Sequence, residues 1–234
     1  MGPDHPLRKR IRELSRRDRA TLFLFVVTLP LAIAFLQILL FLVIIPADIS
    51  PDLVWLSYEN PTLSGMFLSS YFHSIADPGH LYGNYAATCA CMAVIGVMYV
   101  IVMPAYGVSV SRRFTAGSFL SFFLVLPFWI SAVSLYFHPV FPRASWAVGF
   151  SGIGAALLGF ALLLILLSAY TVMLRNSGSA GDETVRALIA ATLFIALGPP
   201  AIMLLEIGGT VNVFAHLAGY SFGLLVPAVL GLRR

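Results

Sequence analysis

Six apolar stretches, each about 20 residues long, divide this 234-residue chain. An α-helix of that length can cross the ~30 Å hydrocarbon core of a bilayer while satisfying its own backbone hydrogen bonds. The stretches do not alternate in polarity every second residue, as strands of an outer-membrane barrel would. We therefore predict an all-α, polytopic membrane protein with six spans, over residues 21–45, 80–103, 118–137, 148–171, 184–207 and 211–232.

The composition supports this fold class. Hydrophobic residues make up 59% of the chain and charged residues only 10%, whereas about a quarter of a soluble domain is charged. We expect a single membrane domain over residues 21–234, preceded by a basic cytoplasmic tail, residues 1–20, which is either a short amphipathic helix or a solvated segment. The first span is too long for a signal-peptide core and no small-residue cleavage site follows it, so we expect it to be retained.

The basic residues predict the orientation. Of the 14 lysines and arginines, seven precede the first span, and all but Arg143 fall on one side of the six-span arrangement. The positive-inside rule then places both termini in the cytoplasm, which requires an even number of spans. The net charge of +4 follows from this topology, and the basic run lacks the interleaved aromatics of a nucleic-acid site. No transit peptide is recognisable, which favours the plasma membrane of a prokaryote.

Several local signals bear on the connections. The first loop, residues 46–79, is rich in aromatic residues and is expected to be a structured element at the membrane interface. In "ADPGHLYGN", Asp77 can cap a helix whose first residue is Pro78. In "LGPPA", Pro199 and Pro200 remove two backbone donors and should kink or break the fifth span.

Cys89 and Cys91 lie two positions apart in the second span and would point in different directions on a helix. We interpret them as small packing residues, and not as a disulfide or a metal site. The sequence indicates no metal or other cofactor.

Four polar side chains are expected at one depth. With the N-terminus inside, the second, fourth and sixth spans all run inward from the outer face, and each carries polar residues near its start: His80 and Asn84, Ser151, and His216. Ionisable residues inside membrane spans usually serve a function. Ser151 shares a helical stripe with small residues, as does His216 with Gly219 and Gly223, and such stripes let membrane helices approach closely.

This pattern predicts nucleophilic catalysis. A serine hydroxyl needs a neighbouring base to take its proton, and a neutral imidazole can do so and later protonate a leaving amine. The backbone N–H of Ser151, in a first helical turn, and the side chains of His80 and Asn84 can donate to an oxyanion. Taken singly, each feature also has a structural explanation: a serine bonded to its own helix, a histidine bonded across helices, or plain packing.

Three motifs in register resemble the rhomboid family of intramembrane serine proteases: "GFSG" at 149–152, "HLYGN" at 80–84 and "HLAGYSFG" at 216–223. The resemblance covers residues 67 to 234. It implies a Ser151–His216 dyad without an acidic third member, with Gly149, His80, Asn84 and the Ser151 amide around the oxyanion. It also implies that Gly219 lies where the sixth helix meets the fourth, and Gly152 and Gly223 are likewise expected to be helix-packing residues at the site. The family cleaves transmembrane proteins in or near their membrane segments, without metal or cofactor.

The chain departs from this pattern in places. Ala155 stands where many members have an aromatic residue that stacks on the base, and Trp55 lacks the arginine that commonly follows it. His73 lies farther upstream of His80 than is typical, either as a water-site residue or, as we favour, a structural interface histidine.

The alternatives to a peptidase are few. A catalytically idle relative would be expected to lack Ser151 or His216, and both are present. A transporter or channel would have charges deep in several spans or two similar halves with broken helices, and neither pattern is seen. For access of substrate, Pro199 and Pro200 are candidate gate residues that would let the fifth helix move away from the second, or they form a static kink. Glu206 is interpreted as interfacial, not catalytic.

Overall fold

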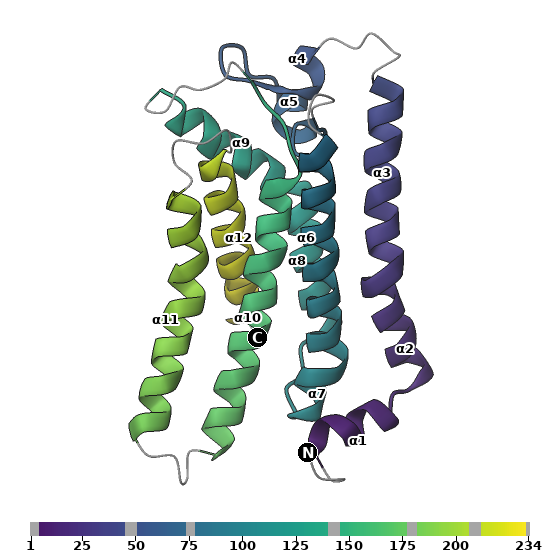
Figure 1. Cartoon of the computed structure of the whole chain (residues 1–234), viewed down its shortest axis with the longest axis vertical. Coiled ribbons are helices and arrows are strands. Elements are labelled where there is room, and N and C mark those ends of the chain that lie inside the picture. Colours follow the sequence, from purple (N-terminus) through teal and green to yellow (C-terminus); the bar gives the residue numbers. More distant parts are fainter. Residues whose placement is uncertain are drawn as a thin grey trace.

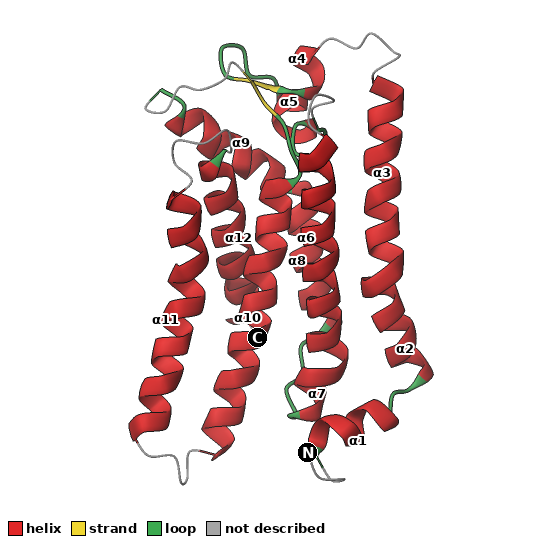
Figure 2. Ribbon diagram, viewed as in Figure 1, coloured by secondary structure: helices red, strands yellow, loops and turns green. Residues whose placement is uncertain are grey.

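Long helices lie side by side in the computed structural model, and short elements cover one end of the bundle (Figures 1 and 2). The structure describes residues 5–44, 51–73, 78–139, 146–176, 182–205 and 212–232. The chain is mostly helical, as the sequence predicts. Its long helical stretches are α2, η1 and α3 (Arg16–Phe23, Leu24–Thr28, Leu29–Ile44), α6, η2 and α7 (Pro78–Val97, Met98–Val102, Met103–Ala105), α8 (Arg112–Leu124), α9 (Leu126–Phe137), α10 (Ser151–Asn176), α11 (Asp182–Leu205) and α12 (Val213–Leu232).

Four stretches are long and apolar enough to cross a membrane: Arg16–Leu39, Gly79–Ala105, Ser151–Met173 and Val213–Gly231. The α8–α9 pair forms a fifth if its two helices, bent by 45°, are counted as one span. The apolar part of α11, Ile189–Leu204, is shorter. The prediction of a helical membrane protein is thus confirmed at the level of four or five candidate spans, while the six-span count and the orientation stay predictions.

The structure corrects one helix boundary and narrows a second expectation. The span predicted over residues 118–137 begins earlier, at Arg112, and the helix is bent at Val125. The bend follows from Pro127, which has no N–H for the carbonyl of Phe123; the Tyr71 hydroxyl donates to that carbonyl instead. The second expectation is a kink or a break at Pro199 and Pro200. The break is absent, because α11 continues through both prolines as one helix, and the kink stays a prediction. The φ angle of proline suits a helix, so the lost donors alone do not interrupt it.

The N-terminal segment is helical. It forms α1 (Pro6–Arg12), and the helix of the first span begins at Arg16, five residues before the predicted start. Ser15 caps that helix by accepting a hydrogen bond from the N–H of Asp18, whose side chain bonds back to the Ser15 N–H.

The described part of the connection between the first two long helical stretches, residues 51–73, is structured, as predicted, while its position at the membrane interface stays a prediction. It contains α4 (Pro51–Val54), β1 (Leu56–Ser57) and α5 (Leu63–Leu68). β1 pairs antiparallel with β2 (Trp146–Ala147), with Leu56 opposite Ala147 and Ser57 opposite Trp146. This short ladder fixes the chain just before Gly149 and Ser151. As predicted, α6 begins at Pro78; its expected cap, Asp77, lies outside the described residues.

α10 is the central helix. In an apolar 18-residue segment of Ser151–Met173, 61% of the residues are buried inside the protein, against 22% in the corresponding segment of Arg16–Leu39 at the edge of the bundle. Its fully buried side chains include Ile153, Leu157 and Phe160. They belong to one core cluster with Met92 and Ile95 of α6, Phe122 of α8 and Leu126 of α9. A buried helix of this kind holds the residues at its start in a fixed position.

Candidate active site

α10 and α12 form the most extensive helix contact, and glycines bring their backbones together. A Cβ atom on Gly219 would overlap the carbonyl oxygen of Gly152 and lie 2.9 Å from its carbonyl carbon. A Cβ atom on Gly223 would likewise overlap the carbonyl of Ala156, one turn further along α10. Only residues without a side chain permit this spacing, as small residues do between membrane helices generally.

This crossing lies beside the predicted dyad. Ser151 is the first residue of α10 and directly precedes Gly152, and His216 lies one turn before Gly219 in α12. The carbonyl oxygen of Ala215 lies 3.3 Å from the point that a Cβ of Gly152 would occupy. The neighbours of Ser151 and His216 are therefore in contact, and both side chains are half-buried.

Gly149 holds the turn that leads into α10. Its φ angle is +142°, which residues with a side chain rarely adopt, and its N–H donates to the Ser69 carbonyl at 2.8 Å. A Cβ atom on Gly149 would lie 3.6 Å from Nε2 of His80 and 3.7 Å from Oγ of Ser151. The structure therefore brings Gly149, His80 and Ser151 together around one point.

Backbone donors are present at the same place. The N–H of Gly154 donates to the carbonyl of Phe150 and makes the first hydrogen bond of α10. The N–H groups of Ser151, Gly152 and Ile153 come before this bond and have no partner within the helix. They lie at the positive end of the helix dipole, where a negative charge is favoured.

His73 connects Asn84 with this turn. Nδ2 of Asn84 lies 3.0 Å from Nε2 of His73, and the N–H of Phe150 points at the same nitrogen from 3.5 Å. Two donors at one nitrogen require a lone pair there, so the imidazole is neutral and carries its proton on Nδ1. Burial, and secondarily the nearby His80, lowers the pKa of His73 to about 4. The Asn84 amide, predicted as an oxyanion donor, is thus held by His73.

Asn212 is a structural residue that the sequence analysis did not identify. Its side-chain oxygen caps α12 by accepting at 3.1 Å from the N–H of Ala215, the residue that directly precedes His216. Its Nδ2 donates to the hydroxyls of Ser134 and Tyr58, at 3.0 and 3.3 Å. The asparagine before the apolar run "VFAHLAG" was a readable helix-start signal.

The candidate gate residues lie elsewhere. Pro199 and Pro200 are half-buried in α11, which packs against α10 and α12. Glu206 lies outside the described residues.

The described part of the chain contains no cluster of side chains suited to bind a metal ion. No group of three histidine, cysteine, aspartate or glutamate side chains there could hold an ion. Cys89 and Cys91 are free thiols.

No family model matches this chain, and comparisons with curated proteins and with solved structures find no significant match to either.

Proposed function

We propose that this chain is an intramembrane serine endopeptidase of the rhomboid type, which cleaves membrane proteins in or near their transmembrane segments. The observation that carries the proposal is the backbone contact of Gly152 with Gly219. It joins the first turn of α10, which bears Ser151, to the turn of α12 that bears His216.

The proposed reaction has two stages. His216 takes the proton of the Ser151 hydroxyl while Oγ attacks the substrate carbonyl carbon, and the tetrahedral intermediate collapses as His216 protonates the leaving amine. Water, activated by the same imidazole, then hydrolyses the acyl ester and restores the free serine.

The surroundings suit the oxyanion of both stages. The Ser151 N–H precedes the hydrogen bonds of α10, and Nε2 of His80 lies on the same side of Gly149 as the Ser151 hydroxyl. Each donor aimed at an oxyanion contributes about 3–4 kcal/mol of barrier lowering. Gly149 leaves room at this point, because a side chain there would project between the two groups.

A fluorophosphonate probe tests the nucleophile without a known substrate. The purified full-length protein is treated with the probe, and labelling is compared with Ser151→Ala, His216→Ala and the control Ser168→Ala. Ser168 lies in the same helix, is buried and donates to the Leu164 carbonyl, so its loss should leave labelling intact. Labelling should vanish in the first two variants.

Cleavage is tested with a tagged single-span substrate co-reconstituted in liposomes. The wild-type protein should release a fragment and Ser151→Ala should not. Equal cleavage, or equal labelling, by the wild type and Ser151→Ala would eliminate Ser151 as the nucleophile.

A further inference from the structure

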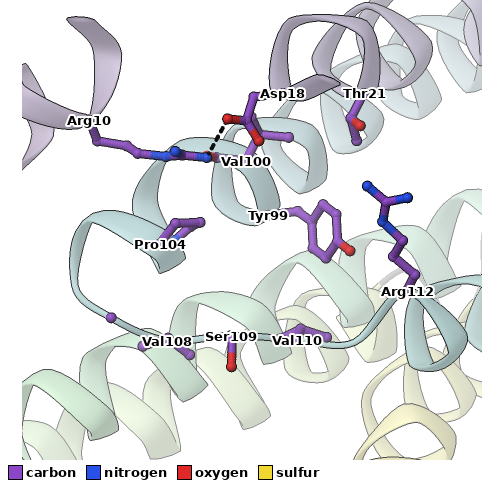
Figure 3. A pocket seen from close by; sticks show the side chains of 11 residues that line it. Arg10, Asp18, Thr21, Tyr99, Val100, Pro104, Val108, Ser109, Val110 and Arg112 are labelled. Atoms are coloured by element: carbon purple, nitrogen blue, oxygen red, sulfur yellow. Dashed lines mark hydrogen bonds and ion pairs between the residues drawn. The ribbon is translucent and has the colours of Figure 1, made fainter. Parts of the chain in front are cut away.

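A cavity of about 390 Å³ lies at the end of the bundle that carries α1 and α7, away from the end where α6, α10 and α12 begin (Figures 1 and 3). Its volume is in the range of small-molecule sites. The polar residues that line it are Arg10, Asp18, Thr21, Tyr99, Ser109 and Arg112. None of them belongs to the candidate active site.

Pro104 explains one wall of the cavity. In an α-helix the carbonyl of Val100 would accept from the N–H of residue 104, which a proline lacks. Arg10 reaches across from α1 and donates to that carbonyl through Nε at 3.1 Å and a terminal nitrogen at 3.0 Å. The same guanidinium pairs with Asp18 at 3.0 Å (Figure 3). These bonds anchor α1 and the start of α2 to the end of the second long helical stretch.

Arg112 supplies the charge that remains for a ligand. The positive charge of Arg10 is balanced by Asp18, and among the described lining residues Asp18 is the sole acid. Arg112, exposed at the first position of α8, extends its guanidinium toward Thr21, beside the ring of Tyr99 (Figure 3). The cavity therefore has a net positive charge, and its guanidinium matches the geometry of a phosphate group.

We propose that this cavity binds the phosphate of an anionic phospholipid from the adjoining leaflet. Basic pockets between membrane helices near a membrane surface bind such headgroups. Pro104, Val108 and Val110 add apolar walls, and beyond Thr21 the same helix continues into the exposed side chains of Phe23 and Leu24. This apolar surface suits the glycerol and acyl chains of a lipid and would contribute nothing to binding a free phosphate ion. The proposal is independent of the peptidase proposal.

Native mass spectrometry of the full-length protein in detergent tests the site. The protein is mixed with phosphatidylglycerol or phosphatidylcholine, and bound lipids are counted for the wild type, Arg112→Gln and Arg113→Gln. Arg113 is the matched control, since it is the exposed neighbour of Arg112 but does not line the cavity. We expect one retained phosphatidylglycerol in the wild type and in Arg113→Gln. In Arg112→Gln the affinity for phosphatidylglycerol should fall by roughly tenfold or more, because a hydrogen bond to a charged group is lost.

A third variant tests whether the cavity itself, and not surface charge in general, holds the lipid. Ser109→Phe keeps every charge but places a ring at the exposed edge of the cavity, and should also displace the lipid. Equal binding of the two lipids by the wild type, or equal loss in both arginine variants, would overturn the proposal. Displacement of phosphatidylglycerol by millimolar inorganic phosphate would likewise overturn it, because the site would then take free phosphate.

Discussion

Gly219→Ala tests whether α10 and α12 touch through their backbones. The new methyl group would overlap the Gly152 carbonyl oxygen and lie 2.9 Å from its carbonyl carbon and 3.2 Å from its Cα. Carbon atoms in contact are about 3.5–4.0 Å apart, so the helices must separate by more than about half an ångström. Overpacking of a tight core typically costs about 1–3 kcal/mol. Since backbone atoms cannot rotate away as a side chain can, we expect the upper end of that range.

Thermal unfolding in detergent measures the effect. Cys89 and Cys91 are free and half-buried in α6, so a thiol-reactive dye reports their exposure on unfolding. For a chain of this size, 1 kcal/mol corresponds to roughly 2–4 °C in Tm, which predicts a fall of roughly 6–12 °C. The control is Gly117→Ala in α8, where no atom lies within 4 Å of the added Cβ. Alanine is the better helix former by up to about 1 kcal/mol, so the control should keep or raise its Tm.

The outcome bears on the proposed site directly. A Tm for Gly219→Ala that equals the wild-type value would show that the helices do not meet at Gly152, and the juxtaposition of Ser151 with His216 would lose its support. A fall of the expected size, with an unchanged control, would localise the contact.

Three other changes have defined outcomes. In the unfolded chain His73 takes up a proton near pH 6.5 but in the folded protein only near pH 4, so its contribution to stability is complete above about pH 6.5 and is lost as the pH falls toward 4. The loss is about 3 kcal/mol. Denaturation of the wild type and of His73→Gln at several pH values should show it, because the free energy of unfolding should fall more steeply between pH 6.5 and 4 in the wild type than in the variant. Gly149→Ala places a side chain at a φ of +142° and should cost about 1–3 kcal/mol and reduce fluorophosphonate labelling; undiminished labelling would argue against the proposed oxyanion site. Tyr71→Phe leaves the Phe123 carbonyl without its donor and should lower stability by about 1–3 kcal/mol, measured as Tm, and an unchanged Tm would contradict this role.

The helices can be predicted from the sequence because a bilayer requires each helix that crosses it to be apolar over about 20 positions. This pattern can be recognised in one segment without knowledge of the neighbouring helices. The start of α6 at Pro78 could be read in the same way, since proline is favoured at the first position of a helix. The glycine stripes on α10 and α12 also carry a local signal, because few other residues allow such close contact.

The remaining features depend on contacts between distant segments. Pro127 and Pro199 look alike in the sequence, yet the chain bends beside the first and continues through the second. The two cases differ in tertiary surroundings, such as the Tyr71 hydroxyl at the first bend. His73 precedes α6 and Asn84 lies within it, eleven positions later, so no helical or strand period relates them. Their hydrogen bond could not be derived from the spacing.

The two carbonyls that prolines leave open, at Val100 and Phe123, share one consequence. Each accepts a hydrogen bond from a residue far away in the chain, Arg10 in one case and Tyr71 in the other. Pro104 thus provides the point at which the N-terminal segment attaches to the helices, and Pro127 provides the point at which the segment containing Tyr71 attaches. A residue with a backbone N–H at position 104 would give the Val100 carbonyl a donor within its own helix. Arg10 would then compete with that N–H for the carbonyl, and the attachment of the N-terminal segment would weaken.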